Sequence, residues 1–389
     1  MKWLLAFNSF KNSLSAVDAV KAFARGLHKG GVKEDDIVLF PIADGGDDTA
    51  RCLQFHLGGR LIRVPCHDPL QRPISASFLW MAHRRTAVVE MSAASGLRLL
   101  KPAERNPLHT DTFGTGELLL AALRRQPDEL LIGVGGSATI DGGAGLLRAL
   151  GARLLDRQGR ELTDFPFQLN RLHRIDDTRL QPLRRSTRWK VLCDVDIPLL
   201  GSHGTVRRYG AQKGASPRMI GPLEAALAQL AEVSLQQTGI ALHRLPRAGA
   251  AGGVAGTLHA WLNAELLPGA QSFLEYTDFS HALSSAAIVV TGEGRIDNQT
   301  LDGKAPLIVA RQAHDRKIPV IALAGDIPAQ ISPALQQPFD ALFSILNGPG
   351  ELSQHIALTR QHLMRTGSQL ARLILHLFPD LPGEKDLVP

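Results

Sequence analysis

The sequence predicts an α/β protein in which a discontinuous, Rossmann-like parallel-sheet domain is interrupted by a second, mixed α/β domain, with an interdomain cleft. Two patterns lead to this prediction. Strands alternate with amphipathic helices at both ends of the chain, whereas short strands separated by turns occupy its middle. The 389 residues are also enough for two hydrophobic cores. We therefore expect one domain from residues 1–62 and 287–389, and an inserted domain from residues 63–286.

The N-terminal region is predicted to alternate between strands and helices. Residues 3–7 form an apolar strand, and Ser15 is in the position of an N-cap for an amphipathic helix that ends at a glycine pair. A second strand over residues 37–41 leads into the turn at 43–48 and a helix over 49–57. This order is typical of a parallel sheet.

The pattern changes at about residue 61, where short apolar segments alternate with turns. Strands are predicted over residues 61–64, 74–81 and 87–91, and we expect them to form a mixed or antiparallel region. A helix over residues 114–125 and a strand over residues 129–134 follow.

Residues 160–188 are polar and carry little periodicity, so they are expected to be surface excursions. A strand over 189–195, a helix from Pro217, and a small-residue loop over 248–256 that leads into a helix complete the middle region.

Strands and helices alternate again near the C-terminus. Strands are predicted over residues 287–291, 319–324 and 341–346, and helices over residues 304–317 and 352–378. Residues 379–389 are expected to be disordered.

The most distinctive segment is residues 131–146, where an apolar strand leads into a glycine-rich run and then a helical pattern. Glycine lets backbone N–H groups approach a ligand closely, and N–H groups at a helix start favour an anion. Ser137 and Thr139 add hydroxyls, and Asp141 adds a carboxylate. We interpret the segment as half of a site for a phosphorylated or carboxylated small molecule. The alternative is a tight turn of an α/β sheet.

The composition favours a globular enzyme that acts on anions. The formal charge is +6, but basic residues are scattered and aromatic residues are only 5% of the chain, so nucleic-acid binding is not expected. Three cysteines without paired spacing indicate a reducing compartment, and we expect a cytoplasmic protein. The N-terminus lacks the features of a signal peptide, and no apolar run is long enough for a membrane span, so no membrane partner is expected.

Polar clusters follow four of the predicted strands. Because ligands bind beyond the carboxyl ends of strands in open parallel sheets, we expect these clusters to share one rim. Their charged members are Lys11, Asp44, Asp194, Asp196, Glu293, Arg295, Asp297 and Lys304. Cations for phosphate oxygens and carboxylates for Mg²⁺ are what phosphoryl transfer requires.

The candidate Mg²⁺ ligands are Asp44, Asp141, Glu293 and Asp297, although an aspartate beside glycine can equally be a turn former. Lys304 precedes a predicted helix, and Lys213 lies between small residues that leave its ammonium group accessible. Each is a candidate phosphate ligand or a solvated surface lysine. Zinc-type histidine spacing, a G-x-S-x-G elbow and a Walker A loop are all missing from the sequence.

Ordered motifs from residue 3 to about residue 346 resemble the glycerate kinase type I family. They include SFK at 9–11, ADGG at 43–46, GVGGSAT at 133–139, QKGA at 212–215, GAAGG at 249–253, TGEGRID at 291–297 and QTLDGKAP at 299–306. The resemblance implies a two-domain α/β enzyme that phosphorylates D-glycerate with ATP and Mg²⁺. Members of this subgroup usually form 2-phospho-D-glycerate.

The resemblance also implies roles for individual residues. Asp194 is expected to accept the proton of the substrate hydroxyl. Lys11, Lys213 and Lys304 are expected to neutralise phosphates or the glycerate carboxylate, with Arg295 as a second carboxylate clamp. The residues expected to bind substrate or phosphate are Ser9, Gly135, Gly136, Ser137, Thr139, Gly252, Gly253, Arg295 and Lys304. The expected partners are D-glycerate and ATP, and a homodimer is left open.

The chain departs from the family pattern at several polar positions. Asn8 replaces an aspartate, while Ile140 and Ile197 replace asparagines. If such asparagines contact glycerate, their loss would cost about 1–3 kcal/mol of binding. These changes favour two alternatives: an impaired homologue that senses a sugar acid or nucleotide, or a kinase for a related hydroxy-acid. A nucleotide-dependent oxidoreductase is a further alternative, but an intact G-x-G-x-x-G is missing after the first strand.

Overall fold

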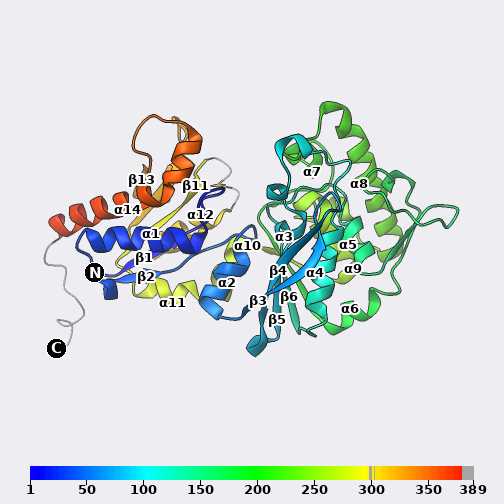
Figure 1. Ribbon diagram of the computed structural model, residues 1–389, viewed down its shortest axis with the longest axis horizontal. Helices are drawn as coiled ribbons and strands as arrows, with labels where there is room; N and C mark the ends of the chain where they lie inside the picture. The colour runs from blue at the N-terminus through cyan, green and yellow to red at the C-terminus, as the bar shows by residue number, and fades with distance from the viewer. Residues whose placement is uncertain (298–299, 302, 379–389) are drawn as a thin grey trace. The chain divides into compact units, whose positions relative to one another are not determined.

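The computed structural model describes residues 1–297, 300–301 and 303–378. Its contacts divide the chain into two compact units (Figure 1). Unit 1 contains Met1–Asp44, Arg51–His56 and the chain from Ala270 onward, and unit 2 contains Gly45–Ala50 and Leu57–Gly269. Both units are α/β, which confirms the predicted fold class.

Unit 1 is built on a five-stranded parallel sheet. The strand order is β13 (Ala341–Ser344), β12 (Val320–Asp326), β11 (Ile288–Arg295), β1 (Trp3–Phe7) and β2 (Ile37–Leu39). β1 pairs with β11 from Trp3↔Ile288 to Phe7↔Gly292, and every residue of β1 is buried. The strands therefore run in one direction, so their carboxyl ends form one edge of the sheet.

The helices of unit 1 include α1 (Ala16–Lys29), α11 (Phe279–Ser284), α12 (Ala305–Asp315), α13 (Pro333–Gln336) and α14 (Leu352–Leu377), with α2 (Thr49–Leu57) and α10 (Gly269–Tyr276) at its boundaries with unit 2. Ser15 caps α1 as predicted, because its side chain accepts a hydrogen bond from the Asp18 N–H. α1 and α14 pack against each other and lie side by side in Figure 1.

Unit 2 contains a six-stranded mixed sheet, as the change of pattern at residue 61 predicted. The order is β10 (Glu265–Pro268), β9 (Arg188–Cys193), β6 (Glu129–Gly133), β5 (Thr86–Glu90), β4 (Pro73–Met81) and β3 (Arg60–His67). Pairs among β10, β9, β6 and β5 are parallel, and β5–β4 and β4–β3 are antiparallel. β7 (Arg153–Leu155) and β8 (Arg174–Asp176) form a separate antiparallel pair.

The α-helices described in unit 2 are α3 (Ser92–Ser95), α4 (Phe113–Leu123), α5 (Ala144–Ala149), α6 (Gln181–Ser186), α7 (Thr205–Tyr209), α8 (Pro217–Thr238) and α9 (Val254–Leu262). α5 has six residues and begins at Ala144, within the last part of the glycine-rich run. The helix that follows the loop is therefore shorter than the sequence pattern suggested.

The prediction that residues 160–188 are surface excursions is wrong. This stretch contains β8 and α6, and it contributes Phe165, Leu169 and Ile175 to the hydrophobic core of unit 2. Its apolar residues are irregularly spaced and lie among many polar ones, so they produced no clear periodic signal.

Several predicted boundaries also move. β2 ends at Leu39 and not Pro41, while β11 continues to Arg295, beyond the predicted end at Thr291. The predicted disordered tail, residues 379–389, lies outside the described residues. No helix in the described part of the chain has the length and apolar character of a membrane span.

Candidate functional site

A cluster of predicted site residues lies at the carboxyl end of the sheet in unit 1. Asn8 follows β1 directly, is almost fully buried, and donates from Nδ2 to Asp44 Oδ2 at 3.0 Å. Its Oδ1 accepts from the Ser9 N–H at 2.7 Å. Asn8 therefore fixes the Asp44 carboxylate next to the turn that carries Ser9 and Lys11, which is a positioning role that an amide can perform.

Glu293 is the buried centre of this cluster. Its Oε1 accepts from Thr300 Oγ1 at 3.1 Å, and its Oε2 lies 3.6 Å from Lys304 Nζ. Burial and the charge of Asp44 raise the pKa of Glu293 to about 7, against the opposing effects of Lys304 and Lys11. Lys11, Asp44 and Lys304 thus all act on Glu293 electrostatically, and the strand-end rule predicted all four residues.

Arg295 and Asp297 pair with each other at the rim of unit 1. Arg295 Nε lies 3.1 Å from Asp297 Oδ2 and 3.3 Å from Asp326 Oδ2, and the arginine side chain is mostly exposed. Asp326 ends β12 and was not among the predicted site residues. The same strand-end rule would have found it had the predicted strand been extended two residues past Ala324.

A cavity of about 580 Å³ opens at this edge of the sheet in unit 1. The charged residues of its lining come from the strand ends and the start of α12, and they include Lys11, Glu293 and Lys304. Other lining residues come from the turn after β1, from the segment between β13 and α14 and from the first turns of α14, including Leu346 and Ile356. Its size falls in the range of small-molecule sites, about 300–1,000 Å³.

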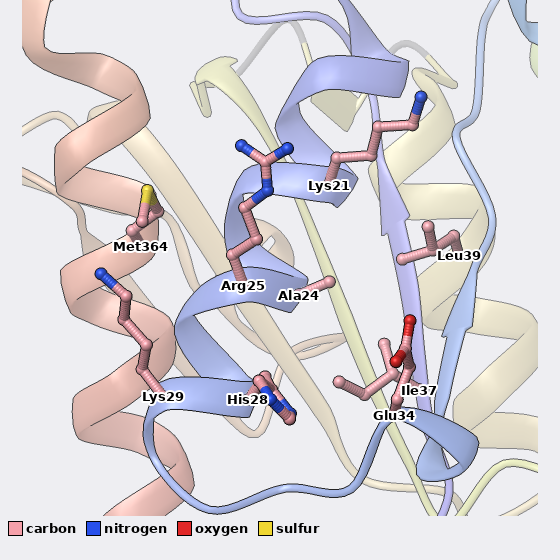
Figure 2. Close-up of a pocket in the computed structure, with 9 residues that line it drawn as sticks. All are labelled: Lys21, Ala24, Arg25, His28, Lys29, Glu34, Ile37, Leu39 and Met364. Carbon is pink, nitrogen blue, oxygen red and sulfur yellow. The ribbon is translucent and has the colours of Figure 1, made fainter.

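A second cavity of unit 1 lies near the opposite edge of the sheet (Figure 2). Lys21, Arg25 and Lys29 of α1 border it, and Ile37 and Leu39 of β2 lie across from them, with Met364 contributed by α14. Ile37 pairs with Trp3, at the start of β1, so this cavity is near the amino ends of the strands. Ligands of parallel sheets bind at carboxyl ends, and we therefore centre the candidate site on the first cavity.

In unit 2, the glycine-rich loop after β6 packs closely against residues 45–48. A Cβ at Gly135 would lie 2.6 Å from Gly46 Cα and 3.0 Å from Asp194 Oδ2. Gly136 has φ +75°, and a Cβ there would lie 3.3 Å from Asp47 Oδ2. Glycine at both positions lets the loop approach Asp47 and Asp194, which no larger residue would allow without displacement.

Lys213 is a buried cation attached to this loop. Its Nζ donates to Ser137 Oγ at 2.8 Å and to the Thr139 carbonyl at 2.9 Å, and its side chain is 6% exposed. Burial lowers the pKa of Lys213 to about 8, while Asp194 and Asp141 oppose the shift. Lys213, Ser137 and Asp194 are therefore neighbours, although they are far apart in the sequence.

Asp141 has contacts that favour a structural role. It is completely buried, and its oxygens accept from the Thr112 N–H and Oγ1 and from the Gly143 and Gly145 N–H groups. Burial raises the pKa of Asp141, and these hydrogen bonds oppose that effect. The carboxylate links the glycine-rich loop to the start of α4. Its contact with a metal ion remains a prediction, and these hydrogen bonds do not favour it.

Gly252 and Gly253 also serve the packing of loops. Their φ angles are +72° and +99°, and a Cβ at Gly252 would lie 2.2 Å from the Thr139 carbonyl oxygen. The Gly252 carbonyl accepts from the Gly142 N–H at 3.0 Å. These glycines bring the 249–253 loop against the glycine-rich loop, and their predicted contact with an anion remains a prediction.

The two isoleucines that depart from the family pattern are interior residues. Ile140 is fully buried in the core of unit 2, and Ile197 is 9% exposed. Both side chains are thus shielded from solvent in this structure.

The donor set is one that suits Mg²⁺ bound together with a nucleotide. Within the described residues, no group of three or more His, Cys, Asp or Glu side chains could hold a metal ion. Mg²⁺ usually takes one or two protein carboxylates and completes its shell with water and substrate phosphates. Asp44 and the buried Glu293, whose raised pKa a nearby cation would lower, fit that requirement.

Comparison with known proteins gives one consistent family. A sequence model of the glycerate kinase family matches residues 3–375. A protein from Bacillus subtilis named glycerate kinase is 41% identical over 374 residues, which cover 96% of this chain and 98% of the relative. A protein from Escherichia coli K12 named glycerate 2-kinase is 37% identical, over 95% of this chain and 97% of its own.

A solved structure agrees with these matches. A crystal structure from Salmonella typhimurium LT2, described as that of a candidate glycerate kinase 2, superposes with a TM-score of 0.82 and 35% sequence identity. The match covers 97% of this chain and 99% of that chain.

Proposed function

The chain belongs to the glycerate kinase family, and from that premise we propose that it transfers the terminal phosphoryl group of ATP to D-glycerate, forming 2-phospho-D-glycerate. The observation that carries the proposal is the charged cluster of unit 1, in which Lys11, Lys304 and Asp44 all act electrostatically on the buried Glu293 carboxylate. Phosphoryl transfer depends on positioning and on charge neutralisation, and this cluster offers groups of both signs.

The residues of unit 1 are assigned to the nucleotide phosphates. Lys11 and Lys304 neutralise phosphate oxygens, and Asp44 and Glu293 hold the Mg²⁺ that accompanies ATP. Bound Mg²⁺ would reduce the negative charge on the phosphates that repels an attacking hydroxyl. Asn8 keeps Asp44 in place through its 3.0 Å hydrogen bond.

The residues of unit 2 are assigned to the acceptor hydroxyl. Asp194 accepts the proton of the attacking hydroxyl as the general base. Asp194 lies near Lys213, because its charge raises the pKa of that lysine against the effect of burial. Ser137 orients the Lys213 ammonium through the 2.8 Å hydrogen bond.

The sensor alternative receives no support from the two isoleucines. Ile140 and Ile197 are buried, so isoleucine in place of asparagine at these positions does not remove an exposed polar side chain. The kinase function is therefore the one we retain.

A coupled assay of ADP release with D-glycerate tests the proposal. We expect turnover by the natural protein and a decrease of at least about hundredfold in the Asp194→Asn variant, as for loss of a general base. Adding enolase identifies the product, because only 2-phosphoglycerate is dehydrated directly. Turnover no higher than that of Asp194→Asn would refute the catalytic assignment.

A further inference from the structure

We propose that the uncharged end of the 580 Å³ cavity in unit 1 binds the adenine and ribose of ATP, with the base against Leu346, Leu352 and Ile356. This inference rests on the proposed use of ATP as phosphoryl donor. It adds which end of the cavity takes the nucleoside and which side chains contact the base.

The distribution of charge along the cavity supports this orientation. Lys11, Arg295 and Lys304, together with Glu293 and Asp326, line the end beside the carboxyl ends of β1, β11 and β12. Among the described lining residues that come from the β13–α14 segment and the start of α14, His355 is the single titratable one. A nucleotide has the same asymmetry, with a polyanion at one end and a flat, weakly polar base at the other.

The uncharged wall is held in position by hydrogen bonds from distant parts of unit 1. Ser13 Oγ donates to the Ile356 carbonyl at 2.8 Å, which ties α14 to the turn after β1. Arg365 Nη2 donates to the Ile345 carbonyl at 3.2 Å, and the Ile345 N–H donates to the Ala324 carbonyl at 2.9 Å. The base would therefore meet a surface that is already formed, which limits the ordering cost of binding.

Two glycines of the lining differ in how much room they have. A Cβ at Gly325 would lie 2.8 Å from the Gly294 carbonyl oxygen, so a larger residue there would displace the adjoining backbone. A Cβ at Gly348 would meet nothing within 4 Å.

The apolar part of the lining favours a nucleotide over the acid substrate. Glycerate is a three-carbon acid with a carboxylate and two hydroxyls, and it has no apolar surface to cover Leu352 or Ile356. A nucleotide base has such a surface, and burying it against these side chains is favourable.

The test compares two tryptophan variants of α14 in the full-length protein. Ile356→Trp fills the uncharged end, whereas Leu358→Trp, two residues further on, adds the same side chain at a position that is 44% exposed and outside the cavity lining. Binding of ADP and of inorganic tripolyphosphate is measured by calorimetry. We expect Ile356→Trp to weaken ADP binding about tenfold or more while tripolyphosphate binding stays within about twofold. Leu358→Trp should change neither.

The inference would be overturned if Ile356→Trp weakened the binding of ADP and of tripolyphosphate equally, or left ADP binding unchanged. It would also be overturned if the natural protein did not bind ADP. Photolabelling of the natural protein with 8-azido-ADP gives an independent readout that requires no variant to fold. The label should appear within residues 345–359 and be blocked by ADP but not by D-glycerate, and a label found only elsewhere would contradict the inference. Neither measurement needs turnover, so absent glycerate phosphorylation with intact ADP binding would reject the proposed function and not this site.

Discussion

At the scale of single residues, buried charge distinguishes the candidate site from the surrounding sheet. Glu293 and Lys213 both have pKa values near neutrality because burial disfavours their ionised forms. Each has a hydrogen-bond partner in another segment, since Glu293 accepts from Thr300 and Lys213 donates to Ser137. Groups in this condition respond strongly to a nearby charge of opposite sign, which is what a phosphate or a metal ion supplies.

Removal of the Lys213 charge should affect catalysis more than stability. We expect Lys213→Met to lower kcat/KM about hundredfold or more, because a preorganised cation beside Asp194 and the loop hydroxyls would be lost. Steady-state kinetics with D-glycerate measure this, and Lys101→Met, an exposed lysine on a 3₁₀ turn, is the control. A Lys213→Met enzyme within threefold of the natural protein would show that this cation is dispensable.

Asp111 should make stability depend on pH. Burial and the charge of Asp141 raise the pKa of Asp111 to about 7 from an ordinary value of 3.8. The folded state therefore binds more protons between these values, and the contribution of Asp111 to the free energy of unfolding is lost as pH rises toward 7 and above.

Asp111→Asn should stabilise the protein at pH 8, because the amide stays neutral. Its oxygen can still accept from Gln71 Nε2 and the Phe113 N–H. We expect a gain on the order of 1 kcal/mol at pH 8 that shrinks toward pH 5. Urea unfolding at both pH values measures it, with the exposed Asp35→Asn as control. An equal effect at the two pH values would contradict this explanation.

At the scale of elements, the sequence pattern predicted the order of the strands well, but their ends and the side-chain partners poorly. The rule that ligands meet at carboxyl ends brought Lys11, Asp44 and Glu293 together, because each lies at or beyond the carboxyl end of a strand of unit 1. The rule also placed Asp194 and Asp196 on that rim, but these residues follow β9, which belongs to the sheet of unit 2. It could not reveal that Asp141 accepts hydrogen bonds from Thr112, since that contact joins loops 29 residues apart in the sequence. It also missed the buried residues of 160–188, whose apolar side chains have no period.

The contact between α1 and α14 should be intolerant of added volume. A Cβ at Gly26 would lie 2.2 Å from the Met364 carbonyl oxygen, a backbone atom that cannot move alone. We expect Gly26→Ala to destabilise the protein by about 1–3 kcal/mol. Gly221 in α8 is the matched control, because a Cβ there meets nothing within 4 Å. Gly221→Ala should be neutral or stabilising by about 0.5–1 kcal/mol, and thermal unfolding that ranks the two variants the other way would refute the packing argument.

At the scale of the whole molecule, the fold class and the family could both be predicted from the sequence. Alternating strands and helices at the two chain ends predicted the parallel sheet of unit 1, and the motif order predicted the glycerate kinase family. The boundaries of the compact units were harder to predict, since Gly45–Ala50 belongs to unit 2 while the residues on both sides belong to unit 1. A prediction that assigns long continuous segments to each domain cannot describe a chain that passes briefly from one unit into the other and back.

Magnesium dependence should reside in unit 1. We expect Asp44→Asn and Glu293→Gln each to raise the Mg²⁺ concentration for half-maximal activity about tenfold or more, because one of two carboxylates is lost. Titration of activity with Mg²⁺ after treatment with a chelator measures this, and Asp315→Asn at the end of α12 is the control. Unchanged Mg²⁺ requirements in both variants would show that the metal does not bind at this cluster.

We propose that this chain phosphorylates the hydroxyl at carbon 2 of D-glycerate. The most direct measurement is a proton-coupled ³¹P NMR spectrum of the products formed from ATP, Mg²⁺ and D-glycerate. We expect a new phosphate-ester resonance split into a doublet by the single proton on carbon 2, and its absence with Asp194→Asn. A triplet from the methylene of the 3-phospho isomer, or a spectrum without a new ester, would contradict it.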